Sequence, residues 1–187
     1  MNILNEFDLE YNSNFLSTIT APCNSGKSAV FEKIMIDYIE KGFDCLCIGE
    51  YNRFSFYKRI QRKMEQYQYL NKNNQGKIIY EKNFNSLNEF YIEKLIQKYK
   101  PRAVFLDYDM QFIRSLNKSY NIPKSLLLEK TIKIEEQNTR DSNRMQMEKA
   151  FYMDLRLLMN KYKLSIYVNK HMNRTIGIPQ GGEIFSM

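Results

Sequence analysis

The sequence predicts an α/β protein with a mainly parallel β-sheet and helices on both faces of that sheet. The first observation is that short β-prone runs alternate along the chain with longer segments of helical spacing. Strands joined through helices pair in parallel, because each crossover returns the chain to the same end of the sheet. The second observation is a length of 187 residues without an internal repeat or linker, which suits one domain over 1–187.

Five runs have the composition of short strands. They lie at 15–20, 43–49, 77–80, 102–108 and 164–168. Within the second run, Cys45 and Cys47 are two positions apart, so both side chains should share one face of the sheet as core residues. The three cysteines of the chain suggest no disulfide framework, which fits a reducing compartment.

Four segments have the spacing of amphipathic helices. The helix predicted at 27–41 should be terminated by Gly42. The helix predicted at 86–99 begins with a capping box, and Pro101 prevents its continuation. The apolar stripe of 27–41 is expected at Val30, Ile34, Tyr38 and Ile39. The stripe of 54–67 is expected at Phe54, Tyr57, Ile60, Met64 and Tyr67. The most regular segment, 144–162, places on one side Met147, Phe151, Leu155, Leu158, Met159 and Tyr162. A less regular helical stretch follows Pro123.

The charge balance favours a polyanionic partner. The chain has 28 Lys and Arg against 21 Asp and Glu, a net charge of +7, and nucleic acid is the simplest partner for such a surplus. Many soluble proteins rich in Lys and Asn are basic without binding DNA, so this alternative stays open. Because no apolar run approaches the roughly 18 residues of a membrane helix, and the first ten residues do not resemble a signal peptide, we expect a cytoplasmic protein without membrane contact.

The segment between the first strand and the first helix has the spacing of a phosphate-binding loop. It reads Ala21-Pro22-Cys23-Asn24-Ser25-Gly26-Lys27-Ser28, in which x-x-x-x-G-K-S connects a strand to a helix. Backbone N–H groups of such a loop and the positive end of the helix dipole hold phosphates. We therefore expect ATP to be bound by Pro22, Cys23, Asn24, Ser25, Gly26, Lys27, Ser28 and Ala29. Ala21 stands where the pattern has its first glycine, which is tolerable if its φ stays negative.

Each candidate site residue has an expected role. Lys27 would reach the β- and γ-phosphates, and the Ser28 hydroxyl would ligate Mg²⁺. Asp107 ends an apolar strand, where a carboxylate can hold Mg²⁺ opposite Ser28, although a polar residue can also simply close a strand. Glu50 follows the second strand and could polarise the attacking water. His171, the only histidine, follows the last strand and could sense the γ-phosphate, although a lone histidine is more often structural.

Two segments could contact nucleic acid. The cations at 53–63 alternate with Tyr51, Phe54, Phe56 and Tyr57, and such mixtures can stack bases and hold phosphates. The same residues also fit the buried stripe and solvated face of an amphipathic helix, and we favour this structural interpretation. For single-stranded DNA we prefer 170–187, a polar segment with Lys170 and Arg174 that is expected to be a mobile loop.

Taken together, these residues resemble the RecA/DnaB superfamily of DNA-dependent ATPases from about residue 15 to 187. Ala103 to Tyr108, followed by Met110-Gln111-Phe112-Ile113, looks like the Asp-Tyr-Leu-Gln segment of DnaB-type replicative helicases, with one extra residue. The stretch ending in His171-Met172-Asn173-Arg174 is similar to the helicase Ser-Gln-Leu-Asn-Arg, in which the glutamine is a phosphate sensor. Val168-Asn169, His171 and Pro179-Gln180-Gly181-Gly182 resemble the DNA-binding loop of RecA and phage UvsX recombinases.

The resemblance implies a RecA-like P-loop NTPase fold, ATP with Mg²⁺, and a homo-oligomeric ring or filament in a bacterium or phage-infected cell. It implies a catalytic glutamate at Glu50 and leaves 1–14 as an N-terminal extension. Between the two branches, we slightly favour a helicase over a recombinase. Because relatives continue with further strands, we expect a chain truncated or reduced at its C-terminus.

Two rival classes stay open. One is a non-motor accessory ATPase such as a helicase loader, which the expected lack of C-terminal strands would suit. The other is a thymidine kinase-like enzyme, whose loop Gly-Pro-Met-Phe-Ser-Gly-Lys-Ser resembles 21–28. Against the kinase, Tyr108 replaces its catalytic glutamate, and its Cys-x-x-Cys zinc pairs are absent from the sequence.

Overall fold

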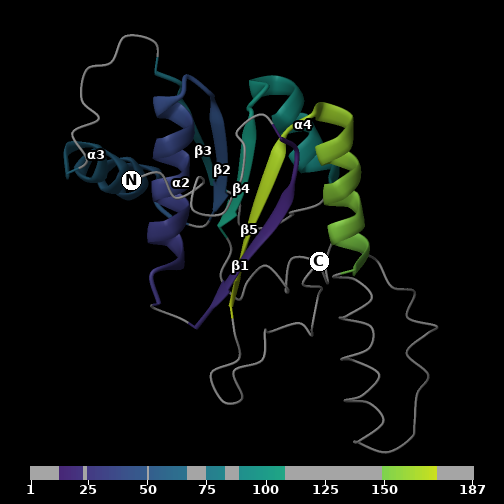
Figure 1. Ribbon diagram of the computed structural model, residues 1–187, viewed down its shortest axis with the longest axis horizontal. Coiled ribbons are helices and arrows are strands. Elements are labelled where there is room, and N and C mark those ends of the chain that lie inside the picture. The colour runs from purple at the N-terminus through teal and green to yellow at the C-terminus, as the bar shows by residue number, and fades with distance from the viewer. Residues whose placement is uncertain are drawn as a thin grey trace, which may run out of the picture.

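The fold is built on a five-stranded sheet in which all strands are parallel (Figure 1). The computed structural model describes residues 13–22, 25–49, 51–66, 75–82, 89–107 and 149–171. Its strands are β1 (Leu16–Ala21), β2 (Cys45–Gly49), β3 (Ile78–Lys82), β4 (Ala103–Asp107) and β5 (Ser165–His171). They are ordered β1-β5-β4-β2-β3 across the sheet. The predicted α/β class and parallel sheet are therefore confirmed.

The last strand lies between two strands that are distant from it in sequence. β5 pairs with β1 on one side, with Ala21 opposite His171, and with β4 on the other, with Leu106 opposite Val168. β2 pairs with β4 so that Gly49 lies opposite Asp107. Because all strands run in the same direction, their carboxyl ends meet at one edge of the sheet. The end of β1, the end of β4 and the end of β5 are therefore neighbours.

Helices cover both faces of the sheet, as predicted. α2 (Lys27–Glu40) and α3 (Arg53–Gln66) pack on one face, and α4 (Glu89–Tyr99) and a helix at 149–162 pack on the other (Figure 1). α2 ends at the predicted position, where Gly42 has φ 84°, a conformation that glycine adopts without steric cost. None of the helices in the described part of the chain is long and apolar enough to cross a bilayer.

Aromatic rings form the centre of the core beneath α2. Phe105 of β4 and Tyr167 of β5 stack with centroids 4.6 Å apart, and Phe31 and Tyr38 of α2 meet both rings edge-on. The hydroxyls of Tyr38 and Tyr167 lie 3.2 Å apart within this cluster. Cys45 and Cys47 both point into the same core, which confirms that they share a face and are free thiols. The burial that accompanies this packing raises the pKa of each thiol well above its ordinary value.

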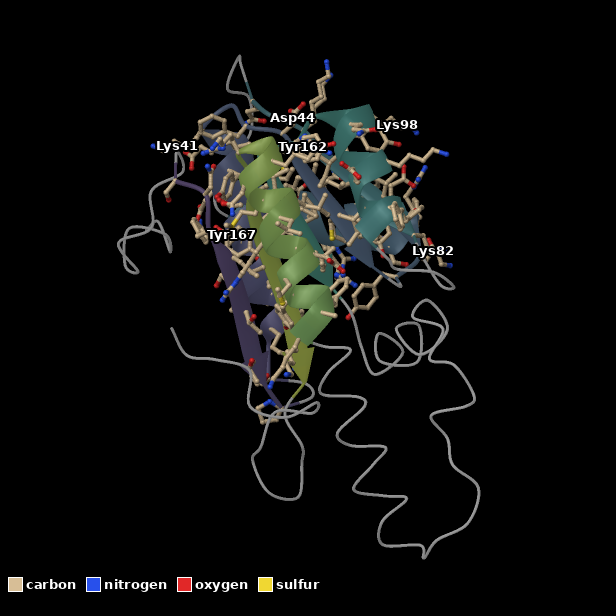
Figure 2. All side chains as sticks on the ribbon, turned by 90° about the vertical axis from the view of Figure 1, so that its right-hand side faces the viewer. Lys41, Asp44, Lys82, Lys98, Tyr162 and Tyr167 are labelled. Carbon is tan, nitrogen blue, oxygen red and sulfur yellow. The ribbon has the colours of Figure 1, made fainter. Side chains whose placement is uncertain are left out.

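The opposite face is aliphatic and is closed by two helices. α4 contributes Ile92, Leu95 and Ile96, and the 149–162 helix contributes Phe151, Leu155 and Leu158. This confirms the predicted stripe of that helix, apart from Met147, which lies outside the described residues. Figure 2 looks onto this side, where Glu93 of α4 accepts hydrogen bonds from Lys161 (2.7 Å) and Tyr162 (2.6 Å) of the neighbouring helix.

The predicted buried stripe of α3 is correct for Ile60 and Met64 but wrong for Phe54 and Tyr57. Phe54 is 74% exposed and Tyr57 is 40% exposed, whereas Phe56 and Ile60 are buried. The buried stripe follows Phe56, Ile60 and Met64 at steps of four, and Phe56 stacks on Tyr80 of β3 with centroids 4.3 Å apart. Two aromatic residues therefore stay on the surface side of α3. Val30 of α2 is also outside the core that was predicted for it, with 36% of its area exposed.

Strand ends differ from the prediction because pairing continues into polar residues. β5 was expected to stop at Val168, with a mobile loop from residue 170 onward. Instead Lys170 and His171 belong to β5, because β1 extends to Ala21 and offers partners to both. β3 likewise continues to Lys82. The capping box before α4, Tyr67 and the helical stretch predicted after Pro123 lie outside the described residues.

The phase of α3 can be tested by comparing two neighbouring alanine substitutions. Phe56→Ala removes a ring that is 1% exposed, so it should lower the free energy of unfolding by about 3–5 kcal/mol. Phe54→Ala removes an exposed ring and should change it by no more than about 0.5 kcal/mol. Urea unfolding followed by circular dichroism measures both. Equal losses from the two variants would contradict the observed phase.

Candidate functional site

The turn between β1 and α2 is shaped by one glycine. Gly26 is the N-cap of α2 with φ 89°, and its carbonyl accepts the hydrogen bond from Val30 N at 3.0 Å. A Cβ at this position would meet no atom of a described residue within 4 Å, so the preference for glycine comes from the left-handed backbone. Ser25 Oγ donates to Pro22 O at 2.7 Å across the turn. Gly26 provides no capping side chain for the start of the helix.

The lysine of the turn points back into it. Lys27 is buried, and its ammonium donates to Ala21 O at 2.8 Å and to Pro22 O at 2.6 Å. A buried ammonium needs such acceptors, because burial without hydrogen bonds is costly. The positive charge is therefore held at the carboxyl end of β1, beside the first turn of α2.

Next to this lysine lies a cluster of three polar side chains. Ser28 Oγ donates to Asp107 Oδ1 at 3.4 Å, and Asn169 Nδ2 donates to the same oxygen at 2.5 Å. Side chains alternate along a strand, so Asp107 and Asn169 follow Phe105 and Tyr167 on the face covered by α2. The aromatic layer of the core thus ends in a polar layer at the carboxyl edge of the sheet.

The carboxyl group of Asp107 is strongly buried, which sets its acidity. Burial raises the pKa of Asp107, while hydrogen bonds from Asn169 and Ser28 partly oppose the increase. The folded chain therefore keeps the Asp107 proton over a pH range in which the unfolded chain has released it. Stability contributed by this group falls as pH rises through that range. A cation placed beside the carboxylate would reverse this penalty.

Asn169 is the residue that the sequence analysis missed. It is 4% exposed, and its Oδ1 atom is buried and accepts no hydrogen bond from any described residue. Burying an amide oxygen without a hydrogen bond costs free energy, so this oxygen could accept a hydrogen bond from water or from a ligand. The only signal in the sequence is a polar residue late in an apolar strand. Its pairing with Asp107 depends on β5 lying beside β4.

A second polar group joins α3 to the same edge. Glu32, one turn after Ser28 on α2, pairs with Arg59 and Lys63 of α3, each at 2.8 Å. The Arg59 guanidinium also lies over the Tyr51 ring, 4.3 Å from its centroid. Tyr51 Oη is in turn 3.5 Å from Ser28 Oγ. The middle of α3, together with Tyr51 just before it, is therefore held against the first half of α2.

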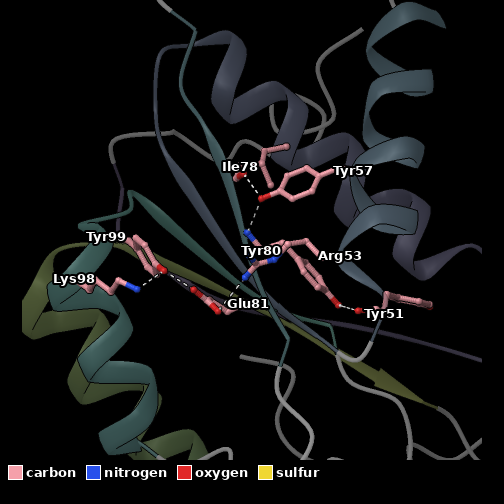
Figure 3. Close-up of polar contacts among 8 residues, drawn as sticks. All are labelled: Tyr51, Arg53, Tyr57, Ile78, Tyr80, Glu81, Lys98 and Tyr99. Carbon is pink, nitrogen blue, oxygen red and sulfur yellow. Dashed lines mark hydrogen bonds and ion pairs between the residues drawn. The ribbon is translucent and has the colours of Figure 1, made fainter.

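Hydrogen bonds of Tyr80 of β3 and Tyr57 of α3 hold the Tyr51 backbone in place (Figure 3). The Tyr80 hydroxyl donates to Tyr51 O at 3.0 Å, and Tyr80 N donates to the Tyr57 hydroxyl at 3.1 Å. The Tyr57 hydroxyl donates to Ile78 O at 3.1 Å. Gly49 leaves little room beneath Tyr80, because a Cβ there would lie 3.1 Å from both the Tyr80 hydroxyl and Asp107 O. Burial raises the pKa of Tyr80, so the hydroxyl stays a donor.

The structure brings together Lys27, Ser28 and Asp107 as the sequence analysis expected. Pro22 and Ala29 supply backbone carbonyls, to Lys27 and to Lys63 respectively. Lys170 lies in β5, and only the backbone of His171 is described, opposite Ala21. Cys23, Asn24, Glu50 and Arg174 lie outside the described residues, so their predicted roles stay predictions.

The fold and these contacts define the class as an α/β protein with a polar site at the carboxyl edge of a parallel sheet. No protein-family model matches the sequence, and no curated protein matches it. Function must therefore be argued from the site itself. Within the described residues, no three His, Cys, Asp or Glu side chains gather where they could hold a metal ion by themselves.

Removing the Asn169 amide should change the acidity of Asp107. Asn169→Ala deletes the 2.5 Å hydrogen bond to the ionised carboxylate, so the pKa of Asp107 should rise further above its ordinary value. The measurement is a carboxyl ¹³C NMR titration. Asn160→Ala, at an exposed position of the 149–162 helix, is the control and should leave Asp107 unchanged. An unchanged Asp107 titration in Asn169→Ala would contradict the assigned contact.

Proposed function

We propose that this chain is a RecA-like P-loop ATPase that binds ATP with Mg²⁺ and uses it to process DNA, as the ATPase core of a replicative helicase. The observation that carries this proposal is the meeting of Lys27, Ser28 and Asp107 at one edge of the sheet. Lys27 and Ser28 are the first two residues of α2, and Asp107, far from them in sequence, ends β4. They provide a phosphate-binding ammonium, a hydroxyl and a carboxylate.

The loop fits a phosphate group. Lys27 already points its ammonium into the turn, where Ala21 and Pro22 offer only neutral carbonyl acceptors. Phosphate oxygens are stronger acceptors for an ammonium, so phosphate would replace these bonds. The open space at Gly26 and the start of α2 add room and a favourable dipole for an anion.

The neighbouring cluster fits a divalent cation that arrives with phosphate. Ser28 and Asp107 offer two oxygen ligands of the kind that Mg²⁺ prefers, and the remaining ligands would be phosphate oxygens and water. When bound, Mg²⁺ would neutralise charge on the β- and γ-phosphates. Asp107 must be ionised for this role, and the hydrogen bond from Asn169 favours the ionised form.

The other proposed roles rest on sequence position. Glu50 follows directly on Gly49, the last residue of β2, which pairs with Asp107. A glutamate there is proposed to polarise the attacking water. His171, at the end of β5 beside Ala21, is proposed to sense the γ-phosphate, and Lys170 and Arg174 to contact single-stranded DNA. Assembly into a homo-oligomeric ring or filament and a cytoplasmic location complete the proposal.

Nucleotide binding provides the first test. The full chain should bind ATP with Mg²⁺ in isothermal titration calorimetry, and Lys27→Ala should weaken binding at least about tenfold, because it removes a charged hydrogen-bond donor. Lys41→Ala, at the exposed C-terminal end of α2, is the matched control and should bind normally. Absence of binding by the unaltered chain would reject the nucleotide site.

The rate of ATP hydrolysis with and without single-stranded DNA tests the second half of the proposal. Single-stranded DNA should raise the rate in the unaltered chain and leave Lys27→Ala inactive. A rate that ignores DNA would reject a DNA motor and leave an accessory ATPase. With stimulation present, strand displacement would identify a helicase, whereas DNA-bound filaments would identify a recombinase. Phosphorylation of thymidine would replace the proposal by a kinase.

A further inference from the structure

Three exposed aromatic residues lie just before α3 or in its first two turns. Phe54 is 74% exposed, and Tyr51 and Tyr57 are each 40% exposed. Phe54 points outward because Phe56 and Ile60 occupy the core side of the helix. An amphipathic helix in a simple structural role would place polar residues there. These rings therefore need an explanation other than the core.

Two of the three rings are held rigidly. The hydroxyl of Tyr57 bonds to Ile78 O and Tyr80 N (Figure 3). The Arg59 guanidinium covers one side of the Tyr51 ring. The Tyr51 backbone is fixed by the Tyr80 hydroxyl. A flat ring that is already ordered loses little conformational entropy when a ligand stacks on it.

The charges of α3 suit a polyanion. Its sequence RFSFYKRIQRKMEQ has five Lys and Arg residues and one Glu. Glu32 neutralises part of this charge through Arg59 and Lys63. Lys58 and Arg62 are exposed and form no ion pair with any described residue, and Arg53 is 60% exposed beside Glu81. Phe54, Lys58 and Arg62 follow one another at steps of four, so they line one side of the helix.

We infer that the α3 face formed by Phe54, Tyr57, Lys58 and Arg62 binds single-stranded nucleic acid. Unpaired bases stack on aromatic rings while Lys and Arg hold the phosphates, a combination typical of such sites. Duplex DNA hides its base faces, so it would use the cations but not the rings. The α3 face would be a DNA surface in addition to the segment 170–187. The inference takes its partner class from the proposed function.

The test measures binding of fluorescein-labelled oligo(dT) to the full chain by fluorescence anisotropy, without nucleotide. Phe54→Ala should weaken binding about tenfold, because one stacking ring is lost. Lys58→Ala should reduce the slope of log affinity against log salt by about 0.7. The matched controls are Phe90→Ala and Lys94→Ala, which offer an exposed aromatic and an exposed lysine at the same spacing on α4 and should bind normally.

The outcomes separate failure of this inference from failure of the proposed function. If oligo(dT) binds but Phe54→Ala and Lys58→Ala behave like the α4 controls, the α3 face is rejected while the DNA partner stands. Loss of binding only in Lys170→Ala and Arg174→Ala would return the DNA surface to 170–187. If the unaltered chain does not bind oligo(dT), both the α3 face and the DNA partner are rejected, but the proposed ATP site is not. Self-association that Phe54→Ala abolishes would assign the face to a second copy and overturn the inference.

Discussion

The insertion of β5 between β1 and β4 is the constraint on which the site depends. Parallel pairing on both sides of β5 fixes Ala21 opposite His171 and Leu106 opposite Val168. Asp107 then lies beside Asn169, and both are within reach of the first turn of α2. A sheet with β1 directly against β4 would keep every strand and helix, but it would remove Asn169 from the carboxylate. The strand order therefore determines which polar groups meet.

The layer beneath these polar groups explains their electrostatics. Phe105 and Tyr167 stack under Asp107 and Asn169 and keep water away from the carboxylate. A desolvated carboxylate is costly in its ionised form, and this is why its pKa is raised. The same desolvation strengthens its attraction for a cation. In the proposed function, this attraction would hold the Mg²⁺ that accompanies ATP.

The sequence predicted those parts of the molecule that depend on local order. The strands, α2 and the positions of Lys27, Ser28 and Asp107 at one edge of the sheet follow from runs and motifs that are contiguous. The phase of α3 did not follow, because Phe54, Phe56 and Tyr57 offer two stripes and only contact with Tyr80 selects Phe56. Asn169 and the full length of β5 depend on pairing with β4 and β1, which are distant in sequence. The local sequence pattern does not specify the pairing register of strands that are distant in sequence.

The hydrogen bonds of Tyr57 have a consequence for how copies of this chain can associate. Within the described sheet, β3 pairs only with β2, so its outer side would be open to strand addition by another molecule. The Tyr57 hydroxyl occupies Ile78 O and Tyr80 N, two backbone groups that an incoming strand would need. The Tyr57 side chain therefore blocks these two backbone groups from pairing with a strand of another molecule. Any ordered assembly on this side of the molecule must use side-chain surfaces instead of a continuous intermolecular sheet.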